Sequence, residues 1–460
     1  MKKHIVVVIP DGVSAKNYIF SPLIEELLKS FTLTIYTSLP KHSFEELFLS
    51  CDTASFNIVE FQPLKESLIT RILRESTSYA RIKFNIKISG NKSIYKFWKK
   101  PSKINARCLL MFLAQFIGTV LSCNYKILLL FERMIASTWN ISAIDNFKKQ
   151  LLQLNPTSVF ISHQRIPNLM PLSLAAKKLN IPVFVAIFSW DNIPKARLNV
   201  KYDKILVWSD YMSQQLQLFY PEILKKNILI TGTPQFEHYF NGKLKIERHD
   251  FAQKYKIDVN KKWILFSGDD VLTSPNDPLY LEDLAVFVAN NYNDEVEIIL
   301  RKAPSDSTNR FDNVVNTYSE IVTKIEPDWC FNQDWSLSLP NAFDLTLQYN
   351  LAYHCKAVVN LGSTMALDFA TFDKPSFYVH YNHSTSNHFD TKQIYSYEHF
   401  KSMHGLNAVE WVTKPEDYKS LFEKLLTKPK TLAKDKQKWL EKIAMHPLTE
   451  SSKRIAKALE

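Results

Sequence analysis

The stretch 357–379, AVVNLGSTMALDFATFDKPSFYV, decides the expected fold of this chain. It begins with an apolar run that ends in a polar residue, as in a buried parallel strand. A turn of small residues follows at 361–364, apolar residues at helical spacing cover 365–372, and an Asp-Lys-Pro stop precedes a second strand from Ser376. Strand, small-residue turn, helix and strand form half of an α/β nucleotide-binding site.

The turn itself is the predicted anion site. The backbone amides of Gly362, Ser363 and Thr364 would lie at a helix N-terminus, which favours a diphosphate. Asp368, one helical turn further on, would then reach a ribose hydroxyl. The alternative is that Ser363 and Thr364 only cap the helix. A capping box needs an acid three residues after the cap, and Ala366 and Leu367 occupy those positions, so the pattern favours the nucleotide site.

The composition narrows the class of protein. A chain of 460 residues predicts two or three domains, and 46% hydrophobic with 22% charged residues is typical of a soluble globular protein. The motifs G-x-G-x-x-G and G-x-x-x-x-G-K-[ST] are both absent, which argues against NAD enzymes and P-loop NTPases. The five cysteines have no C-x-x-C spacing, so we expect no zinc site, no disulfide framework and a reducing cytoplasm.

Three predicted strands in the first half of the chain are followed by polar residues. We expect a strand at 4–9, a loop at 10–17 and a helix at 18–30, with further strands at 158–162 and 181–188. In open α/β sheets ligands bind outside the carboxyl ends of strands, so polar residues directly after strands are candidate functional groups. These residues are Asp11, His163 and Asp191. The alternative is that they are ordinary turn residues, as the Asp-Gly pair at Asp11 would allow.

The second half repeats the β-loop-α pattern. Gly268 follows a predicted strand at 263–267, and Arg301 and Lys302 follow another at 296–300. Two cations at a strand end, in the same domain as the Gly362 turn, suit a diphosphate. The alternative is that they are two solvated surface charges.

Residues 81–107 are rich in Lys and Arg, contain no acid and include aromatic residues, and the net charge of the chain is +11. The apolar run at 109–121 is shorter than the roughly 20 residues that span a bilayer. The run is either a buried helix or an interfacial element. Single-stranded nucleic acid also suits a basic-aromatic strip, but no RNA-binding motif supports it, so we expect an anionic membrane surface, bound through 81–131, and no nucleic acid.

Four segments together resemble the GT-B glycosyltransferases that build bacterial surface polysaccharide and lipopolysaccharide. They also resemble two related groups, the CDP-glycerol glycerophosphotransferases and the UDP-N-acetylglucosamine 2-epimerases. The segments are SHQRIP at 162–167, FSWDNIPKAR at 188–197, ITGTPQF at 230–236 and NLGSTMALDFATFDKP at 360–375.

The resemblance implies two Rossmann-like β/α/β domains that face each other across a cleft. Residues 1–245 would bind the acceptor, 246–430 would bind the nucleotide-sugar, and 431–460 would form helices that pack back on the first domain. Gly268, Arg301, Lys302 and the 362–364 turn would hold the diphosphate, and Asp368 would stand where many members have Glu.

The resemblance also implies the activity. An E-x7-E motif is missing at the expected place, which favours inversion, and the candidates for the base that inversion needs are Asp11, His163 and Asp191. GT-B enzymes need no metal, so we expect no metal or other cofactor and a UDP- or GDP-linked donor. The acceptor would be a lipid-linked or surface glycan at the inner face of the cytoplasmic membrane. Alternatives are a glycerophosphotransferase, although Arg-Lys-Ala-Pro at 301–304 lacks its histidine, and a non-catalytic lipid- or nucleic-acid-binding protein.

Overall fold

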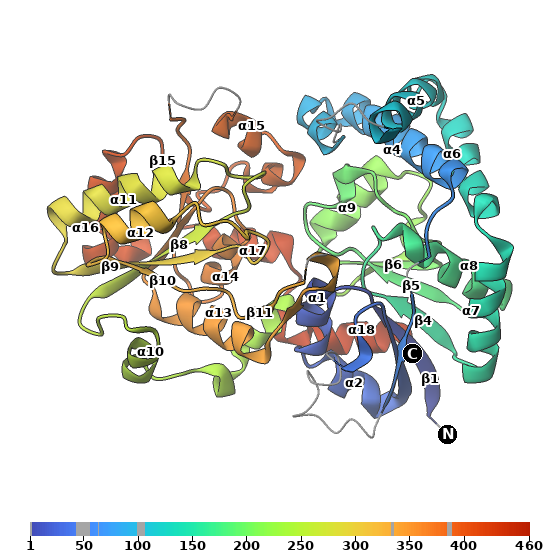
Figure 1. The fold of residues 1–460 in the computed structure, drawn as a ribbon, viewed down its shortest axis with the longest axis horizontal. Helices are drawn as coiled ribbons and strands as arrows, with labels where there is room; N and C mark the ends of the chain where they lie inside the picture. Colours follow the sequence, from blue (N-terminus) through green and yellow to red (C-terminus); the bar gives the residue numbers. More distant parts are fainter. Residues whose placement is uncertain (1, 43–55, 63, 99–105, 333–334, 384–388) are drawn as a thin grey trace. The chain divides into compact units, whose positions relative to one another are not determined.

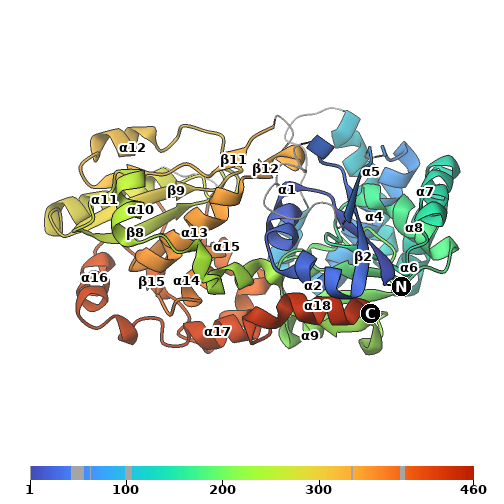
Figure 2. The same ribbon diagram turned by 90° about the horizontal axis from the view of Figure 1, so that it is seen from below.

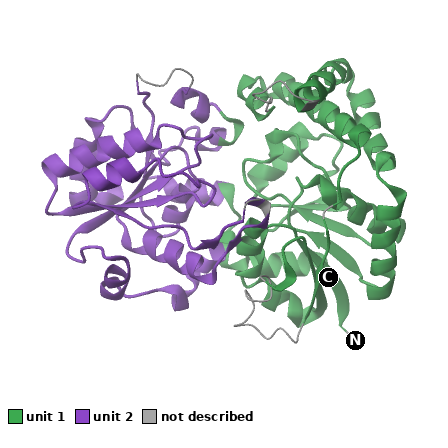
Figure 3. Ribbon diagram, in the orientation of Figure 1, with its two compact units in different colours: residues 1–235, 397–399, 443–460 green, residues 236–396, 400–442 purple. Residues whose placement is uncertain are grey.

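The computed structural model describes residues 2–42, 56–62, 64–98, 106–332, 335–383 and 389–460. The chain forms two compact units (Figures 1 and 3). Unit 1 comprises residues 1–235, 397–399 and 443–460, and unit 2 comprises residues 236–396 and 400–442. The division falls before the expected boundary at 245/246, and the expected cleft stays a prediction.

Unit 1 contains a parallel sheet in the order β3-β2-β1-β4-β5-β6-β7. Residues 5–9 of β1 are fully buried, and Ile5 pairs with Leu33 on one side and Ser158 on the other. Because every strand pair is parallel, all carboxyl ends lie at one edge of the sheet. The strands are β1 (Lys3–Ile9), β2 (Phe31–Thr37), β3 (Phe56–Glu60), β4 (Ser158–Ile161), β5 (Val183–Ala186), β6 (Lys204–Val207) and β7 (Ile228–Ile230).

The connection after β1 differs from the expected loop and single helix. The α1 turn (Gly12–Ser14) begins directly after Asp11, a π-helical turn (Ala15–Ile19) follows, and α2 (Leu23–Ser30) is a separate helix. The prediction of a loop over 10–17 and a helix over 18–30 was therefore wrong. The physical reason is that the Asp11 carboxylate accepts a hydrogen bond from the Ser14 amide and starts a helix early, while Pro22 lacks the amide that would continue it.

The C-terminal helices divide between the two units. The last helix, α18 (Ser451–Leu459), packs on α2 in unit 1, as Figure 2 shows. Ser30 Oγ donates to the Glu460 carboxylate at 2.8 Å. Residues 431–442, including most of α17 (Lys436–Ile443), belong to unit 2. The return to the first unit therefore involves only 443–460.

A helical insertion separates β3 from β4. It contains α4 (Leu68–Ser89), a 3₁₀ turn (Lys92–Phe97), α5 (Ala106–Leu121), α6 (Tyr125–Met134) and α7 (Ile141–Leu154). The other helices of unit 1 are α8 (Met170–Lys178) and α9 (Asp210–Phe219).

The insertion corrects one feature of the predicted basic strip at 81–107. Arg81 is only 1% exposed, because its guanidinium pairs with Glu132 at 2.6 Å and Glu222 at 2.9 Å. Trp98 is also buried. The part of the strip at 99–105 lies outside the described residues.

Helix α5 presents an apolar face to solvent. Leu109 is 74% exposed, Phe116 71% and Val120 61%. Within the described ranges, no single helix is long and apolar enough to cross a bilayer. The segment 125–138, which is α6 with the turn after it, and α7 together have the length and apolar composition of one span, but the two are bent by 75° relative to each other.

Unit 2 contains a second parallel sheet, in the order β10-β9-β8-β13-β14-β15, and a small antiparallel pair. Apolar side chains of the sheet, of α11 (Asp277–Asn291) and of α16 (Asp417–Thr427) form its core, among them Phe266, Leu284 and Phe422. The strands are β8 (Lys262–Gly268), β9 (Val296–Lys302), β10 (Val322–Lys324), β13 (Ala357–Asn360), β14 (Ser376–Val379) and β15 (Glu410–Val412), with β11 (Trp329–Cys330) pairing with β12 (Leu339–Pro340). The helices are α10 (Arg248–Tyr255), α11 (Asp277–Asn291), α12 (Asp312–Thr317), α13 (Ala342–His354), α14 (Met365–Ala370), α15 (Thr391–Tyr395) and α16 (Asp417–Thr427).

Candidate functional site

Three neighbouring strands of unit 1 bring polar residues to one edge. Strands β1, β4 and β5 are adjacent in the sheet, and the chain continues from their carboxyl ends into Asp11, His163 and Asp191. The structure brings Asp11 and His163 into direct contact. The His163 Nδ1 and Asp11 Oδ2 atoms are 2.7 Å apart, and the two side chains are 12% and 13% exposed.

The Asp11–His163 pair is oriented by its surroundings. The other Asp11 oxygen accepts the Ser14 amide at 2.7 Å. Burial favours a higher pKa for Asp11, but hydrogen bonds from His163 and Ser14 outweigh it and hold the pKa below its usual value. The carboxylate therefore stays ionised and holds the imidazole through Nδ1. The ring stacks on Phe188 at 3.9 Å between centroids, and its Nε2 is buried with no hydrogen-bond partner in the described chain.

Asp191 has a different environment. Its carboxylate accepts hydrogen bonds from Lys195 Nζ and from Asn192 Nδ2, the latter at 2.6 Å. Burial favours a higher pKa, yet the charges of Lys195 and His399 hold the pKa of Asp191 well below its usual range. So acidic a carboxylate is a weak proton acceptor, which argues against Asp191 as a base.

Sequence reasoning did not assign a role to two other residues of unit 1. Arg165 stands two positions after His163, its Nε is buried without a partner in the described ranges, and burial lowers its pKa despite the charges of Asp191 and Asp11. Its place in the segment SHQRIP was a usable signal. His399 packs its ring on Trp190 at 4.6 Å, and burial lowers its pKa to about 4. No sequence pattern indicates this contact, because residues 397–399 enter unit 1 from within unit 2.

In unit 2 the predicted turn lies between β13 and α14. Gly362 has a φ of +69°, and an added Cβ would stand 2.8 Å from Phe400 Cζ, so both conformation and space require glycine. The Ser363 amide donates to Asn360 Oδ1 at 2.9 Å, so the turn itself already satisfies one of the three predicted anion-binding amides. Helix α14 is only six residues long, so its dipole is small.

Asp368 points to the interior of unit 2. It is 6% exposed, and its charge raises the pKa of the Tyr239 and Tyr378 hydroxyls, on which burial has the larger effect. Its assignment to a ribose hydroxyl stays a prediction.

The two predicted diphosphate cations are buried and have partners. Arg301 Nη2 donates to both oxygens of the fully buried Asp344, at 2.8 and 3.1 Å, while its Nε has no partner in the described chain. Lys302 Nζ donates to the Thr308 carbonyl at 3.2 Å and lies 3.4 Å from Glu326. Neither cation is the solvated surface charge that the sequence left open as an alternative. Their role at a diphosphate stays a prediction.

The end of β8 carries an acidic pair that sequence reasoning passed over. At Gly268 a Cβ would meet the Phe311 ring at 2.8 Å, so close packing explains the glycine. The next residue, Asp269, donates its amide to Asp277 Oδ2 at 2.6 Å. Burial raises the pKa of Asp269 to about 7 and that of Asp277 to about 6, and the like charges add to the rise at Asp269. In the described part of the chain, no group of three or more His, Cys, Asp or Glu could hold a metal ion.

We compared the chain with known protein families, sequences and structures. No protein-family model matches the sequence, and no curated protein sequence matches it. Among solved structures, a putative UDP-N-acetylglucosamine 2-epimerase from Listeria monocytogenes aligns with a TM-score of 0.58 at 9% identity, over 100% of this chain and 96% of its own. A UDP-GlcNAc 2-epimerase from Neisseria meningitidis, bound to UDP-GlcNAc, aligns at 0.53 and 13% identity over 99% of both chains.

A glycosyltransferase from Rickettsia africae aligns with a TM-score of 0.54 at 11% identity, over 100% of this chain and 98% of its own. At these identities the likeness establishes the fold alone. It confirms the predicted α/β class with two Rossmann-like domains. The chain therefore has a GT-B-like fold, with one parallel sheet of seven strands and one of six.

Proposed function

We propose that the protein is a GT-B glycosyltransferase that moves a sugar from a nucleotide-sugar to a lipid-linked or surface-glycan acceptor, with inversion and without a metal. The observation that carries the proposal is the Asp11–His163 pair. An imidazole whose Nδ1 is held by a carboxylate, and whose Nε2 has no hydrogen-bond partner in the described chain, has the arrangement of a general base. The shared fold supports a nucleotide-sugar substrate, since one structural neighbour holds UDP-GlcNAc.

In the proposed reaction His163 Nε2 takes the proton of the acceptor hydroxyl as its oxygen attacks the anomeric carbon of the donor. The new carbon–oxygen bond forms as the bond to the diphosphate breaks, and a nucleoside diphosphate leaves. The Asp11 carboxylate stabilises the imidazolium that results. The donor would be held in unit 2 by the 362–364 turn, with Gly268, Arg301, Lys302 and Asp368.

A second candidate is an epimerase that acts on the nucleotide-sugar alone. The acidic pair Asp269 and Asp277 favours it, because groups with pKa values of about 7 and 6 exchange protons near neutrality. Several structural neighbours, including the two epimerases described above, carry that name. The reactions differ in their products, since a transferase needs an acceptor and releases a nucleoside diphosphate. An epimerase needs no acceptor, and a glycerophosphotransferase would release CMP.

The activity is tested by a screen followed by one substitution. Thermal shift with UDP, GDP, CDP, CMP and ADP identifies the nucleobase that the protein recognises. The matching nucleotide-sugar is then tested for nucleoside diphosphate release with lipid-linked acceptors. His163→Gln should lower kcat by roughly 10²- to 10⁴-fold, the usual contribution of a general base, and leave nucleotide affinity unchanged. A lack of stabilisation by every nucleotide, or a fully active His163→Gln enzyme, would overturn the proposal.

For the acceptor, we propose that the apolar face of α5 rests on an anionic bilayer at the cytoplasmic side of the membrane. Leu109, Phe116 and Val120 lie on one side of the helix and are all more than half exposed. Exposed cations at Arg107 and Lys126 stand near this face in sequence and suit anionic headgroups. Such an arrangement would bring a lipid-linked acceptor to the enzyme.

The membrane proposal has a matched control. Leu109→Ser with Phe116→Ser should reduce co-sedimentation with phosphatidylglycerol vesicles. Leu152→Ser removes a leucine of α7 that is 59% exposed, and it should leave vesicle binding unchanged. Equal binding by all variants would refute the proposed contact.

A further inference from the structure

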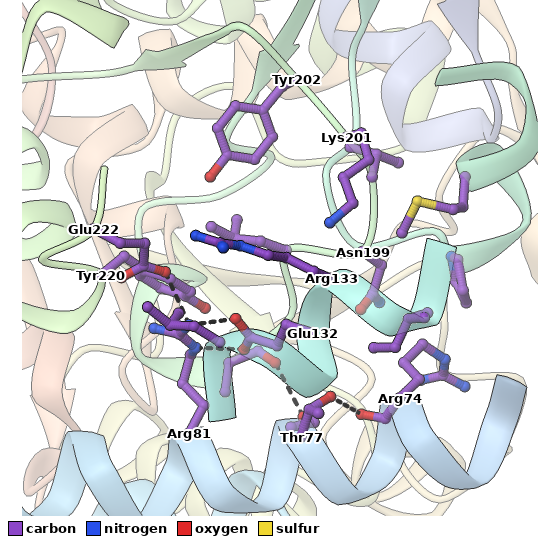
Figure 4. Close-up of a pocket in the computed structure, with 18 of the residues that line it drawn as sticks. Arg74, Thr77, Arg81, Glu132, Arg133, Asn199, Lys201, Tyr202, Tyr220 and Glu222 are labelled. Atoms are coloured by element: carbon purple, nitrogen blue, oxygen red, sulfur yellow. Dashed lines mark hydrogen bonds and ion pairs between the residues drawn. The ribbon is translucent and has the colours of Figure 1, made fainter. Parts of the chain in front are cut away.

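Unit 1 contains a cavity of about 300 Å³ that the proposed reaction does not use (Figure 4). Its walls come from α4, α6 and the segments that lead into β6 and β7. Lys201 and Tyr202 directly precede β6, and Tyr220 precedes β7, so these residues approach the amino ends of the strands. Asp11 and His163 follow the carboxyl ends, and neither lines the cavity. The cavity is therefore a separate site.

The acidic groups around this cavity already have cationic partners in direct contact. Arg81 holds Glu132 and Glu222. The remaining acids of the lining have their own cations, since Arg74 pairs with Glu66 and Lys177 pairs with Asp203. Each acid of the lining thus has a cation within 3 Å, and Glu132 and Glu222 share theirs.

Two cations of the lining have no such direct partner. In the described part of the chain, the side-chain nitrogens of Lys201 and Arg133 make no hydrogen bond or ion pair. In Figure 4 the Lys201 ammonium and the Tyr202 hydroxyl both point toward the Arg133 guanidinium. Burial lowers the pKa of Lys201, and the positive charges of Lys177 and Arg133 lower it further, against the opposite effect of Glu132. An anion between Lys201 and Arg133 would relieve this repulsion.

Two buried donors in the lining also lack acceptors. Tyr220 is 3% exposed, and its hydroxyl has no hydrogen-bond partner among the described residues. The indole Nε1 of Trp139, itself 5% exposed, has none there either. Burying a polar group without a hydrogen bond is unfavourable, so such groups indicate a missing partner. The Trp139 indole can only donate and the Tyr220 hydroxyl can donate, as Lys201 and Arg133 do, so one acceptor-rich ligand would satisfy these groups together.

We infer that this cavity binds a small phosphate-bearing ligand, whose phosphate oxygens accept hydrogen bonds from Lys201 and Arg133. Two adjacent cations match the charge of a phosphate monoester. Apolar side chains of the same lining, such as Leu129 and Ile135, contact the carbon part of the ligand. The phosphate belongs either to a soluble ester or to a lipid headgroup, and helix α6, which supplies Arg133, also exposes Ile127 and Leu130.

The test is a titration of the full chain with inorganic phosphate, followed by calorimetry or ³¹P NMR. Lys201→Gln and Arg133→Gln should each weaken phosphate binding by about tenfold or more, because each removes a charge-assisted hydrogen bond. Lys149→Gln removes the same charge from an exposed residue of α7 outside the cavity and should bind phosphate as the wild type does. Equal affinity of the wild type and both cavity variants, or no binding to any, would overturn the inference.

Tyr220→Phe separates a binding role from a structural one. Loss of a hydroxyl that lacks a partner should raise Tm without phosphate and weaken phosphate binding. A lower Tm with unchanged binding would assign the hydroxyl to the fold and contradict its place in the site. His163→Gln should leave phosphate binding intact, which keeps this inference independent of the proposed reaction.

Vesicle-binding measurements identify the source of the phosphate. If the ligand is a headgroup, Lys201→Gln should weaken binding to vesicles of phosphatidic acid and phosphatidylcholine, and inorganic phosphate should compete. If the ligand is a soluble ester, vesicle binding should stay unchanged while phosphate and glycerol phosphate binding falls. Either pattern supports a phosphate site, and vesicle loss without any loss of phosphate binding refutes it.

Discussion

Asp11→Asn tests the proposed chemistry most directly. Asn has nearly the shape of Asp and caps helices equally well, so the hydrogen bond from the Ser14 amide is kept and the fold should remain. The negative charge 2.7 Å from His163 Nδ1 is lost. The substitution therefore removes the group that stabilises the imidazolium and leaves the imidazole in place.

The magnitude follows from the contact. A hydrogen bond to a charged group contributes about 1.5–3 kcal/mol, and this pair is mostly shielded from solvent, so little of that is lost to screening. At about 1.4 kcal/mol for each factor of ten, kcat should fall by roughly 10- to 150-fold. If Asp11 were itself the base, the loss would instead match that of His163→Gln.

The assay is release of nucleoside diphosphate under saturating donor and acceptor, for Asp11→Asn, His163→Gln and the double variant. Because the two residues act as a unit, the double variant should be no slower than His163→Gln alone. Additive losses, an unaffected Asp11→Asn enzyme, or a loss equal to that of His163→Gln would each refute the assigned roles.

Three further substitutions test the structure of unit 2. Arg301→Gln leaves the buried Asp344 carboxylate without its ion pair, and urea unfolding should show a loss of about 3–5 kcal/mol. Gly362→Ala forces a side chain into a left-handed conformation and should cost at least about 1–2 kcal/mol in the same measurement. Burial raises the pKa of Asp269 from its usual 3.8 to about 7, so the folded protein binds this proton more tightly than the unfolded chain. Stability should therefore fall as pH rises between these values, and Asp269→Asn should gain on the order of 4 kcal/mol over the wild type at pH 8 relative to pH 4.

Each of these predictions has a control. Lys324→Gln breaks a partly exposed ion pair with Asp312 and should cost less than about 1 kcal/mol. Gly242→Ala introduces a Cβ that meets nothing within 4 Å and should be nearly neutral. A stable Arg301→Gln protein, equal effects of the two glycine substitutions, or a pH-independent gain in Asp269→Asn would contradict the respective argument.

Local pattern was enough to predict much of the fold. The strands at 357–360 and 376–379 and the helix that starts at Met365 follow from apolar periodicity and the Asp-Lys-Pro stop, which act within a few residues. The same holds for the strand-end placement of Asp11, His163 and Asp191, because parallel strands share one edge.

Tertiary structure alone decided which polar groups meet. Asp11 and His163 stand 152 positions apart, and only the adjacency of β1 and β4 brings their side chains within 2.7 Å. The sequence placed Arg81 in a basic surface strip, because its partners Glu132 and Glu222 come from distant segments and no local pattern indicates them. Arg301 likewise pairs with Asp344, which lies 43 positions away in the sequence. Periodicity reports which face of an element is apolar, whereas the pairing of charges depends on which elements the sheet order places side by side.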